Sequence, residues 1–217
     1  MKGDRMKTRV LSVKILANAD RGLLERLEVP AGHRSLGFIT TDCDDVGYAS
    51  LDEATKKAEV QVAYARSMYA GASNASTALA GEFIGILSGP DPEEVRSGLE
   101  AFISYAENDA AFYSANDDDS IVYFAHCISR TGSYLSKAAE VPEGTAMAYL
   151  IAPPLEAMVG VDAALKAAAV EMRVFYGPPS ETNFAGALLT GEQSACKAAC
   201  EAFAEKVCSI AASPIEY

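Results

Sequence analysis

The residues best able to do chemistry lie near the end of the chain, where three of the five cysteines fall close together. The stretch Ser194–Cys208 reads SACKAACEAFAEKVC. Clustered thiols can bind a soft metal or form a redox pair. However, Cys196, Cys200, Phe203 and Val207 follow the spacing i, i+4, i+7, i+11 of an apolar helix face, where free cysteine behaves as a small hydrophobic residue. We therefore predict a buried helix here and no metal site.

An acidic run in the first half of the chain is the second candidate site. Asp42-Cys43-Asp44-Asp45 follows the apolar stretch LGFIT, which is typical of a strand. Carboxylates clustered at the end of a strand can bind a small organic cation through charge and hydrogen bonds. The residues alone favour the other interpretation, a solvated turn.

Signals for catalysis are weak. The two histidines, His33 and His126, have no partner at catalytic spacing. His126 and Cys127 are neighbours in a predicted strand, so their side chains point to opposite faces and do not readily share one metal. No P-loop, G-x-G-x-x-G, G-x-S-x-G or H-E-x-x-H motif occurs. We expect no catalytic residues and no enzyme activity.

Charge and composition exclude several classes of partner. The net charge of −12 disfavours nucleic acid and anionic membrane surfaces. No apolar run approaches the roughly 20 residues that a bilayer requires, and the N-terminus lacks the apolar core of a signal peptide. An odd number of cysteines argues against a disulfide framework. A cytoplasmic location follows as the expectation.

The sequence contains an internal repeat, so the elements that must position these residues occur in two copies. Val29-Pro30-Ala31-Gly32 recurs as Val141-Pro142-Glu143-Gly144, 112 residues later, and similar blocks recur in the same order at spacings that fall to 101 residues. The spacing shortens where the first copy has the longer of two Gly/Ser/Pro-rich loops, and surface loops tolerate such length changes best. We predict domains at residues 1–103 and 121–217, joined by a linker at 104–120.

Each copy mixes strand and helix patterns in the same order. Strands are predicted from β-branched and aromatic content, and helices from apolar residues at helical spacing. The predicted strands cover residues 8–16, 34–41 and 81–89 with counterparts at 120–128, 146–153 and 183–191, and the middle helices cover 50–60 and 160–170. A further strand, such as 170–176, follows each middle helix, and a closing helix ends each copy. The fold class is α+β, of the α/β sandwich type, with a four-stranded, mainly antiparallel sheet flanked by helices in each copy.

The repeated unit resembles bacterial microcompartment shell proteins. The resemblance is carried by GVDAALKAAAVEMRVFYGPPSETNFAGALLTGEQSACKAACEAF in the second copy and by RSLGFITTDCDDVGYASLDEATK in the first, and by SRTGSYLS and MAYLIAPPLEA. Because the segment from VLSVKIL to VPAG precedes the core, the order resembles two circularly permuted shell domains in tandem. The similarity is greatest to shell proteins of ethanolamine-utilisation microcompartments.

This resemblance implies a structural function and a set of partners. It implies a homotrimer that imitates a hexamer and tiles the microcompartment shell with other shell proteins, in the cytoplasm, around ethanolamine-degrading enzymes. Ethanolamine would cross through pores. No cofactor is required, and cobalamin is a candidate bound or transported ligand. The alternative is a soluble sensor or regulator that binds a small amine with a duplicated α/β domain.

The resemblance also implies roles for individual residues. The set implied to bind ethanolamine in a small pore between the domains is Asp44, Asp45, Glu82, Phe112, Thr182 and Asn183. Tyr69, Phe112 and Tyr113 would gate a central pore, although a loop aromatic is more often a local hydrophobic anchor. Lys56 and Lys166 would lie at the tile edge; the alternative is a solvated helical lysine.

Overall fold

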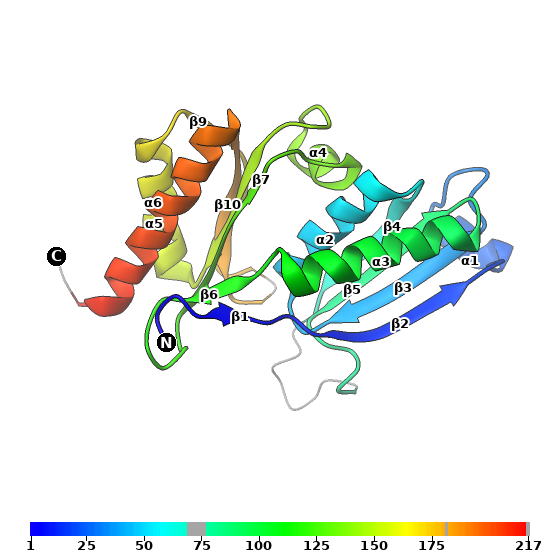
Figure 1. Cartoon of the computed structure of the whole chain (residues 1–217), viewed down its shortest axis with the longest axis horizontal. Helices are drawn as coiled ribbons and strands as arrows, with labels where there is room; N and C mark the ends of the chain where they lie inside the picture. The colour runs from blue at the N-terminus through cyan, green and yellow to red at the C-terminus, as the bar shows by residue number, and fades with distance from the viewer. Residues whose placement is uncertain (69–76, 181, 216–217) are drawn as a thin grey trace. The chain divides into compact units, whose positions relative to one another are not determined.

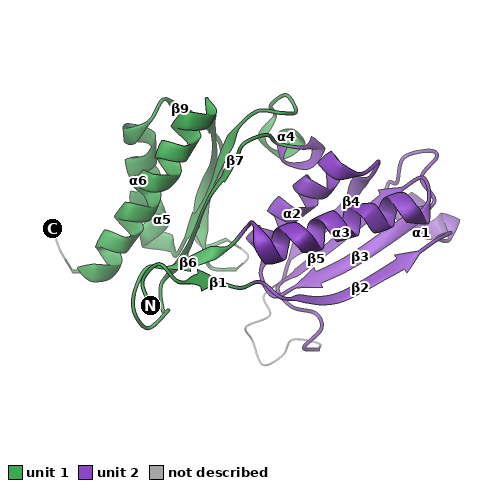
Figure 2. Ribbon diagram, viewed as in Figure 1, with its two compact units in different colours: residues 1–7, 111–131, 136–217 green, residues 8–110, 132–135 purple. Residues whose placement is uncertain are grey.

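The computed structural model describes residues 1–68, 77–180 and 182–215, which form two compact units (Figure 2). Unit 2 comprises residues 8–110 and 132–135 and holds the first repeat copy. Unit 1 comprises residues 1–7, 111–131 and 136–217 and holds the second. Within the described residues, no helix combines the length and the apolar character that crossing a membrane requires.

Unit 2 is a four-stranded antiparallel sheet, and its two longer helices pack side by side on one face (Figure 1). Its strand order is β2-β3-β5-β4, from β2 (Val10–Leu16), β3 (Ser35–Thr41), β5 (Phe83–Gly89) and β4 (Gln61–Ser67). Its helices are α1 (Arg21–Arg26), α2 (Asp44–Lys57) and α3 (Pro92–Asn108). Asp91 caps α3 by accepting hydrogen bonds from the Glu93 and Glu94 amides, and Pro92 occupies its first turn, where its missing N–H costs nothing.

Unit 1 repeats this plan and adds two short strands. Its sheet has the order β1-β6-β7-β8-β10-β9. The strands are β1 (Arg5–Met6), β6 (Phe112–Ser114), β7 (Val122–Ile128), β8 (Met147–Ala152), β10 (Ala185–Gly191) and β9 (Val170–Tyr176). The helices are α5 (Pro154–Ala167) and α6 (Gln193–Ala212), while α4 (Ser133–Ala139) begins in unit 2 and ends in unit 1. The predicted antiparallel α+β fold is confirmed in both copies, and β1 and β6 extend the second sheet beyond the four expected strands.

The residues predicted as a linker have structure of their own. Residues 104–108 continue α3, and residues 112–114 form β6, which pairs with β1 and β7. The N-terminal strand β1 therefore belongs to unit 1, although the sequence predicted residues 1–103 as one domain. Sequence periodicity does not reveal this, because a strand of two residues is too short to show a pattern.

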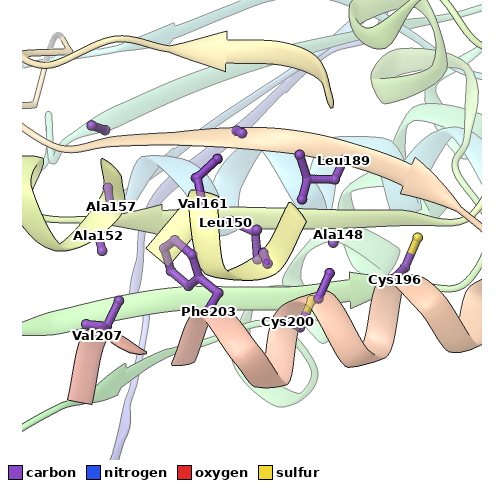
Figure 3. Packing of buried hydrophobic residues seen from close by; sticks show 14 of the residues in the cluster. Ala148, Leu150, Ala152, Ala157, Val161, Leu189, Cys196, Cys200, Phe203 and Val207 are labelled. Atoms are coloured by element: carbon purple, nitrogen blue, oxygen red, sulfur yellow. The ribbon is translucent and has the colours of Figure 1, made fainter. Parts of the chain in front are cut away.

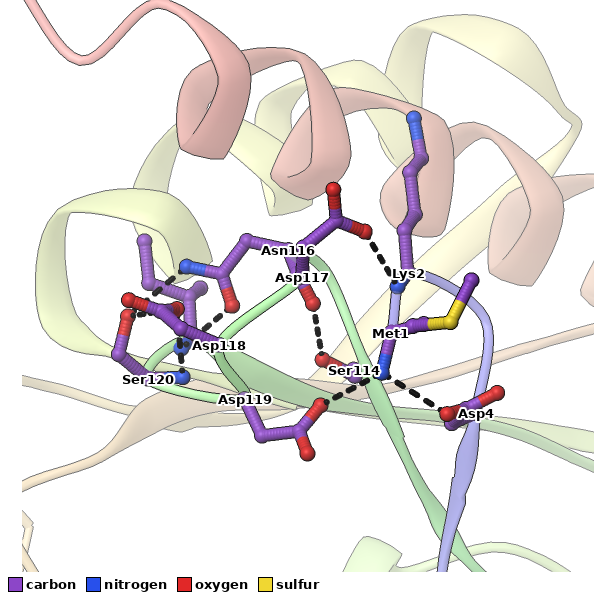
Figure 4. A network of polar contacts seen from close by, with 10 residues as sticks. Met1, Lys2, Asp4, Ser114, Asn116, Asp117, Asp118, Asp119 and Ser120 are labelled. Atoms are coloured by element: carbon purple, nitrogen blue, oxygen red, sulfur yellow. Dashed lines mark hydrogen bonds and ion pairs between the residues drawn. The ribbon is translucent and has the colours of Figure 1, made fainter.

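A polar network joins the start of the chain to the loop after β6 (Figure 4). The Met1 ammonium lies 2.8 Å from an Asp4 oxygen and 3.2 Å from an Asp119 oxygen. The Lys2 amide donates to Asp117. These groups are exposed, so we assign the network a local role in holding β1 beside β6.

The cysteines of α6 lie in the core of unit 1. Figure 3 shows Cys196, Cys200, Phe203 and Val207 on the side of the helix that faces the sheet, and all four are buried. This confirms the predicted apolar helix face. Burial raises the pKa of the Cys200 and Cys196 thiols, so they stay protonated and are poor nucleophiles.

We predict that Cys200→Ser destabilises the chain by about 1–2 kcal/mol, because it buries a hydroxyl among apolar side chains. Cys200→Ala should cost less, since alanine adds no polar group. Urea denaturation of both variants measures the difference. Equal or greater loss in the alanine variant would contradict the interpretation of Cys200 as a small hydrophobic residue.

Candidate functional site

A cavity of about 300 Å³ lies in unit 2 beside the acidic run. Its lining residues come from the start of β2, the end of β3 and the segment before β5: Arg9, Leu11, Asp42, Thr77, Ala78, Gly81 and Glu82. The backbone sets this arrangement, because β3 and β5 are antiparallel and Thr41 pairs with Phe83. Asp42 at the end of β3 and Glu82 before β5 are therefore brought to the same edge of the sheet.

Gly81 allows the chain to turn tightly into this cavity. Its φ is +63°, and a Cβ at this position would collide with the Thr41 carbonyl oxygen. Only glycine satisfies both the left-handed backbone and the close approach without strain. The Glu82 amide then donates to the Thr41 carbonyl at 2.9 Å, which fixes the backbone from which the Glu82 side chain projects.

Glu82 supplies a carboxylate that has no neutralising partner among the described residues. Burial raises its pKa above the ordinary glutamate value, and repulsion from Asp44 and then Asp42 raises it further. Among the described residues its carboxylate accepts no hydrogen bond and forms no ion pair. A half-buried carboxylate in this setting is stabilised when a cation binds beside it.

Asp42 is already paired with a cation. Arg9 Nε lies 2.7 Å from Asp42 Oδ2, and the Arg9 amide donates to Asp42 Oδ1 at 2.7 Å. Sequence reasoning missed Arg9, because thirty-odd residues separate it from its partner and only the β2–β3 pairing brings the two together. Both oxygens of Asp42 are therefore occupied by Arg9. Among the described lining residues, Glu82 is left as the carboxylate able to accept from a ligand.

Asp44 and Asp45 are buried at the N-terminal end of α2, where the positive end of the helix dipole favours carboxylates. Burial raises the pKa of Asp44, while a hydrogen bond from the Ser67 hydroxyl lowers it. The Ser67 hydroxyl oxygen also lies 2.9 Å from the Tyr48 hydroxyl oxygen. Of these two aspartates, Asp44 lies close enough to Glu82 for its charge to raise the pKa of that lining residue.

The neighbouring Cys43 is not a reactive group. Burial raises the pKa of its thiol well above the usual range, and the charge of Asp45 raises it further. A thiol in this environment is a poor nucleophile and a poor metal ligand. Across the part of the chain that the structure describes, no group of three or more His, Cys, Asp or Glu side chains is placed to hold a metal ion.

The other residues predicted to bind ethanolamine belong to unit 1. Thr182 and Asn183 lie in the turn between β9 and β10, where Asn183 is exposed with a φ of +65° and its amide donates to the Ser180 carbonyl. Phe112 is buried, with its ring 5.3 Å from Phe124 and 5.9 Å from Phe184, centroid to centroid. The structure thus brings Asp44, Asp45 and Glu82 together in one unit and holds the other three in the other.

The predicted gate and edge residues also differ in setting. Tyr69 lies outside the described residues, Tyr113 is half-buried beside Tyr123, and Phe112 packs as a hydrophobic anchor. Lys56 is part of an ion-pair group with Glu53 and Asp52. Lys166 is exposed and pairs with Asp162 at 2.6 Å, so the two repeats present their lysines differently.

Comparisons with known proteins agree with this architecture. A model of the BMC domain matches residues 35–116. The chain is 64% identical to the bacterial microcompartment shell protein EutL of Clostridium perfringens over the full length of both. It is 50% identical over 213 residues to EutL of Escherichia coli K12, covering 98% of this chain and 97% of that one.

The solved structures extend the agreement to three dimensions. The crystal structure of ethanolamine utilization protein EutL from Leptotrichia buccalis superposes with a TM-score of 0.98 at 65% identity, with both chains covered completely. Identity at this level over the whole length, together with the doubled domain and its strand order, establishes the relationship. The chain belongs to the family of bacterial microcompartment shell proteins.

Proposed function

We propose that the chain is a structural tile in the shell of an ethanolamine-utilisation microcompartment, and that its acidic cavity binds ethanolamine. The observation that carries the structural role is the full-length similarity to shell proteins named EutL. Its function is to form the wall and to let small molecules pass, not to catalyse a reaction. The shell location and association with other shell proteins follow from the same relationship.

The Glu82 carboxylate carries the ligand proposal. Ethanolamine has an ammonium group and a hydroxyl group, and Glu82, which no described residue neutralises, offers an acceptor for the ammonium. Thr77 in the cavity lining carries a neutral hydroxyl able to recognise an alcohol, and the Ser67 hydroxyl, which lies beside the buried Asp44, is another such group in unit 2. The assignment of Phe112, Thr182 and Asn183 to the same ligand stays a prediction, which Asn183→Ala tests by calorimetry.

The assembly proposal is a homotrimer that forms flat sheets with its neighbours. Size-exclusion chromatography with light scattering should give three times the chain mass, and negative-stain microscopy at high concentration should show sheets. Lys166→Ala should reduce sheets without changing the trimer, since we assign this exposed ammonium to the proposed tile edge. Lys197→Ala is the matched control, because Lys197 is equally exposed and also pairs with a carboxylate one helical turn away. A monomer or dimer that never forms sheets would favour the amine sensor instead.

Cobalamin is proposed as a second ligand or cargo, and no cofactor is required for a structural role. Equilibrium dialysis of the trimer with cobalamin tests this proposal, and retention no greater than that of serum albumin would contradict it. Association with the encapsulated ethanolamine-degrading enzymes is the remaining partner proposal and is tested by co-sedimentation with assembled sheets.

A further inference from the structure

The cavity beside the acidic run contains two carboxylates, and one of them is already paired with a cation of the chain. Asp42 and Glu82 line the cavity together with Arg9. Arg9 Nε and the Arg9 amide nitrogen each lie 2.7 Å from an Asp42 oxygen. An ammonium ligand gains nothing from a guanidinium in the lining, because like charges repel. The guanidinium must therefore have another role at a site for cations.

The Arg9–Asp42 pair is positioned by the backbone where β2 meets β3. Val10 and Thr41 pair in the ladder between these strands. One residue beyond that pair, the Asp42 amide donates to the Arg9 carbonyl at 3.2 Å, and the Arg9 amide donates to the Asp42 side chain. The two residues are thus held opposite each other before the guanidinium adds its own hydrogen bond. Little conformational entropy is then lost when the ion pair forms.

The second repeat copy replaces the three charged lining residues by apolar ones. Arg9 lies one residue before β2, Asp42 one residue after β3 and Glu82 one residue before β5. The residues at the same places in the second copy are Ile121 before β7, Pro153 after β8 and Phe184 before β10. The three charges occur together in one copy and are replaced together in the other. This pattern is expected of residues that serve one site.

Arg9 determines how many negative charges of the lining remain for a ligand. Burial, and then the charges of Asp44 and Asp42, raise the pKa of Glu82, so the charge of Asp42 is felt at Glu82. Without Arg9, Asp42 and Glu82 would both be open to a ligand in the same cavity. Two carboxylates favour a ligand with two positive charges, because each ion pair adds to the attraction. Ethanolamine carries only one.

We propose that Arg9 is a specificity-determining residue that makes the cavity select ligands with one ammonium group over aliphatic diamines. The inference rests on the proposed ethanolamine site and adds the residue that excludes dicationic competitors. Arg9 occupies Asp42, so a ligand meets the Glu82 carboxylate alone. The second ammonium of a diamine would lie beside the guanidinium, where repulsion opposes binding.

The test compares the affinities for ethanolamine and 1,4-diaminobutane by calorimetry at neutral pH and one ionic strength. Both amino groups of this diamine are protonated at neutral pH. In Arg9→Gln the ratio of diamine affinity to ethanolamine affinity should rise at least about fivefold, because Asp42 becomes available to the second ammonium. The Arg9 side chain is 76% exposed, so glutamine should leave the fold intact. Circular dichroism spectra that match the unsubstituted chain establish this.

Three further variants assign the effect to the charge of Arg9. Arg9→Lys keeps a cation in the lining and should change the ratio less than Arg9→Gln does. Lys7→Gln removes the same charge from an exposed residue that is not among the described lining residues, so the ratio should stay unchanged. Arg9→Gln combined with Asp42→Asn should lose the gain, because the second carboxylate is gone. The double variant separates a contact with Asp42 from a general increase in cation binding.

The outcomes separate this inference from the ethanolamine proposal. If the unsubstituted chain binds ethanolamine and Arg9→Gln leaves the ratio unchanged, Arg9 does not set specificity, while the ethanolamine proposal stands. If the double variant keeps the gain, Asp42 is not the second carboxylate and the inference is wrong. Tighter binding of the diamine than of ethanolamine by the unsubstituted chain would also overturn it. If the unsubstituted chain binds neither amine, both proposals fail.

Discussion

Asp52→Ala should lower the free energy of unfolding by about 2–4 kcal/mol, the largest effect we expect from a single polar substitution. The Asp52 carboxylate is buried and accepts from two backbone amides, those of Gly132 and Leu135. Burial raises its pKa, while these two amides and Lys56 lower it, so the charge is only partly compensated. Removing it nevertheless leaves two amides without acceptors, and this loss outweighs the relief of desolvation.

Asp162→Ala is the matched control, since Asp162 occupies the same repeat position on α5. It is exposed and pairs with Lys166 one turn away, an arrangement worth about 0.3–0.5 kcal/mol. Urea denaturation of both variants at one protein concentration measures the difference. Hydrogen exchange should show faster exchange at the Gly132 and Leu135 amides in the Asp52 variant. Equal stability losses in the two variants would show that the Asp52 contacts contribute little.

Asp52→Asn should lower the free energy of unfolding nearly as much as Asp52→Ala, although asparagine has almost the same shape as aspartate. An asparagine side chain offers one acceptor oxygen, whereas the two amides approach different oxygens of Asp52. Its amide nitrogen would face a backbone N–H and could not accept from it. Stability equal to that of the unsubstituted chain would contradict this account.

Glu82→Gln should weaken ethanolamine binding at least about tenfold, on the scale of one charge-assisted hydrogen bond. The substitution preserves shape and removes a carboxylate of the cavity lining that has no ion-pair partner in the described part of the chain. Calorimetry with ethanolamine measures the loss. Ethylamine lacks the hydroxyl group and ethylene glycol lacks the ammonium group, so these two probes separate the contributions. Unchanged affinity in Glu82→Gln would place the ligand elsewhere.

The same substitution should not destabilise the fold at neutral pH. The pKa of Glu82 is raised above its value in the unfolded chain, so its favourable contribution is complete below the unfolded pKa and is lost as pH rises through the folded pKa. At neutral pH the carboxylate therefore opposes folding, and glutamine removes that opposition. A thermal midpoint equal to or above that of the unsubstituted chain, together with lost binding, would identify Glu82 as a ligand group retained against stability.

Ethanolamine affinity should also fall on acidification. Protonation of Glu82 removes the charge that attracts the ammonium, and the raised pKa moves this loss to a higher pH than an ordinary glutamate would show. Calorimetry at decreasing pH should show the ethanolamine affinity of the unsubstituted chain falling. The weaker affinity of Glu82→Gln should not change with pH over the same range. The same decline in both proteins would assign the titrating group to another residue.

The internal repeat by itself determined much of the fold. Two copies with the same order of patterns predicted two antiparallel sheets with helices, and the spacing of Cys196, Cys200 and Phe203 predicted the buried face of α6. These predictions succeeded because the period of apolar residues depends on local geometry, which the sequence records directly. The acidic run was located in the same way, at the end of a predicted strand.

The tertiary structure decided which element covers which surface. The sequence shows that α2 and α5 are equivalent, but not that Asp52 is buried against Gly132 while Asp162 is exposed. It does not show that Arg9 neutralises Asp42 while Glu82 pairs with no group in residues 1–68, 77–180 and 182–215. The physical reason is that periodicity identifies the apolar face of an element, whereas its partner is set by contacts between residues far apart in the chain. Such contacts cover one face of α2 and leave the equivalent face of α5 exposed.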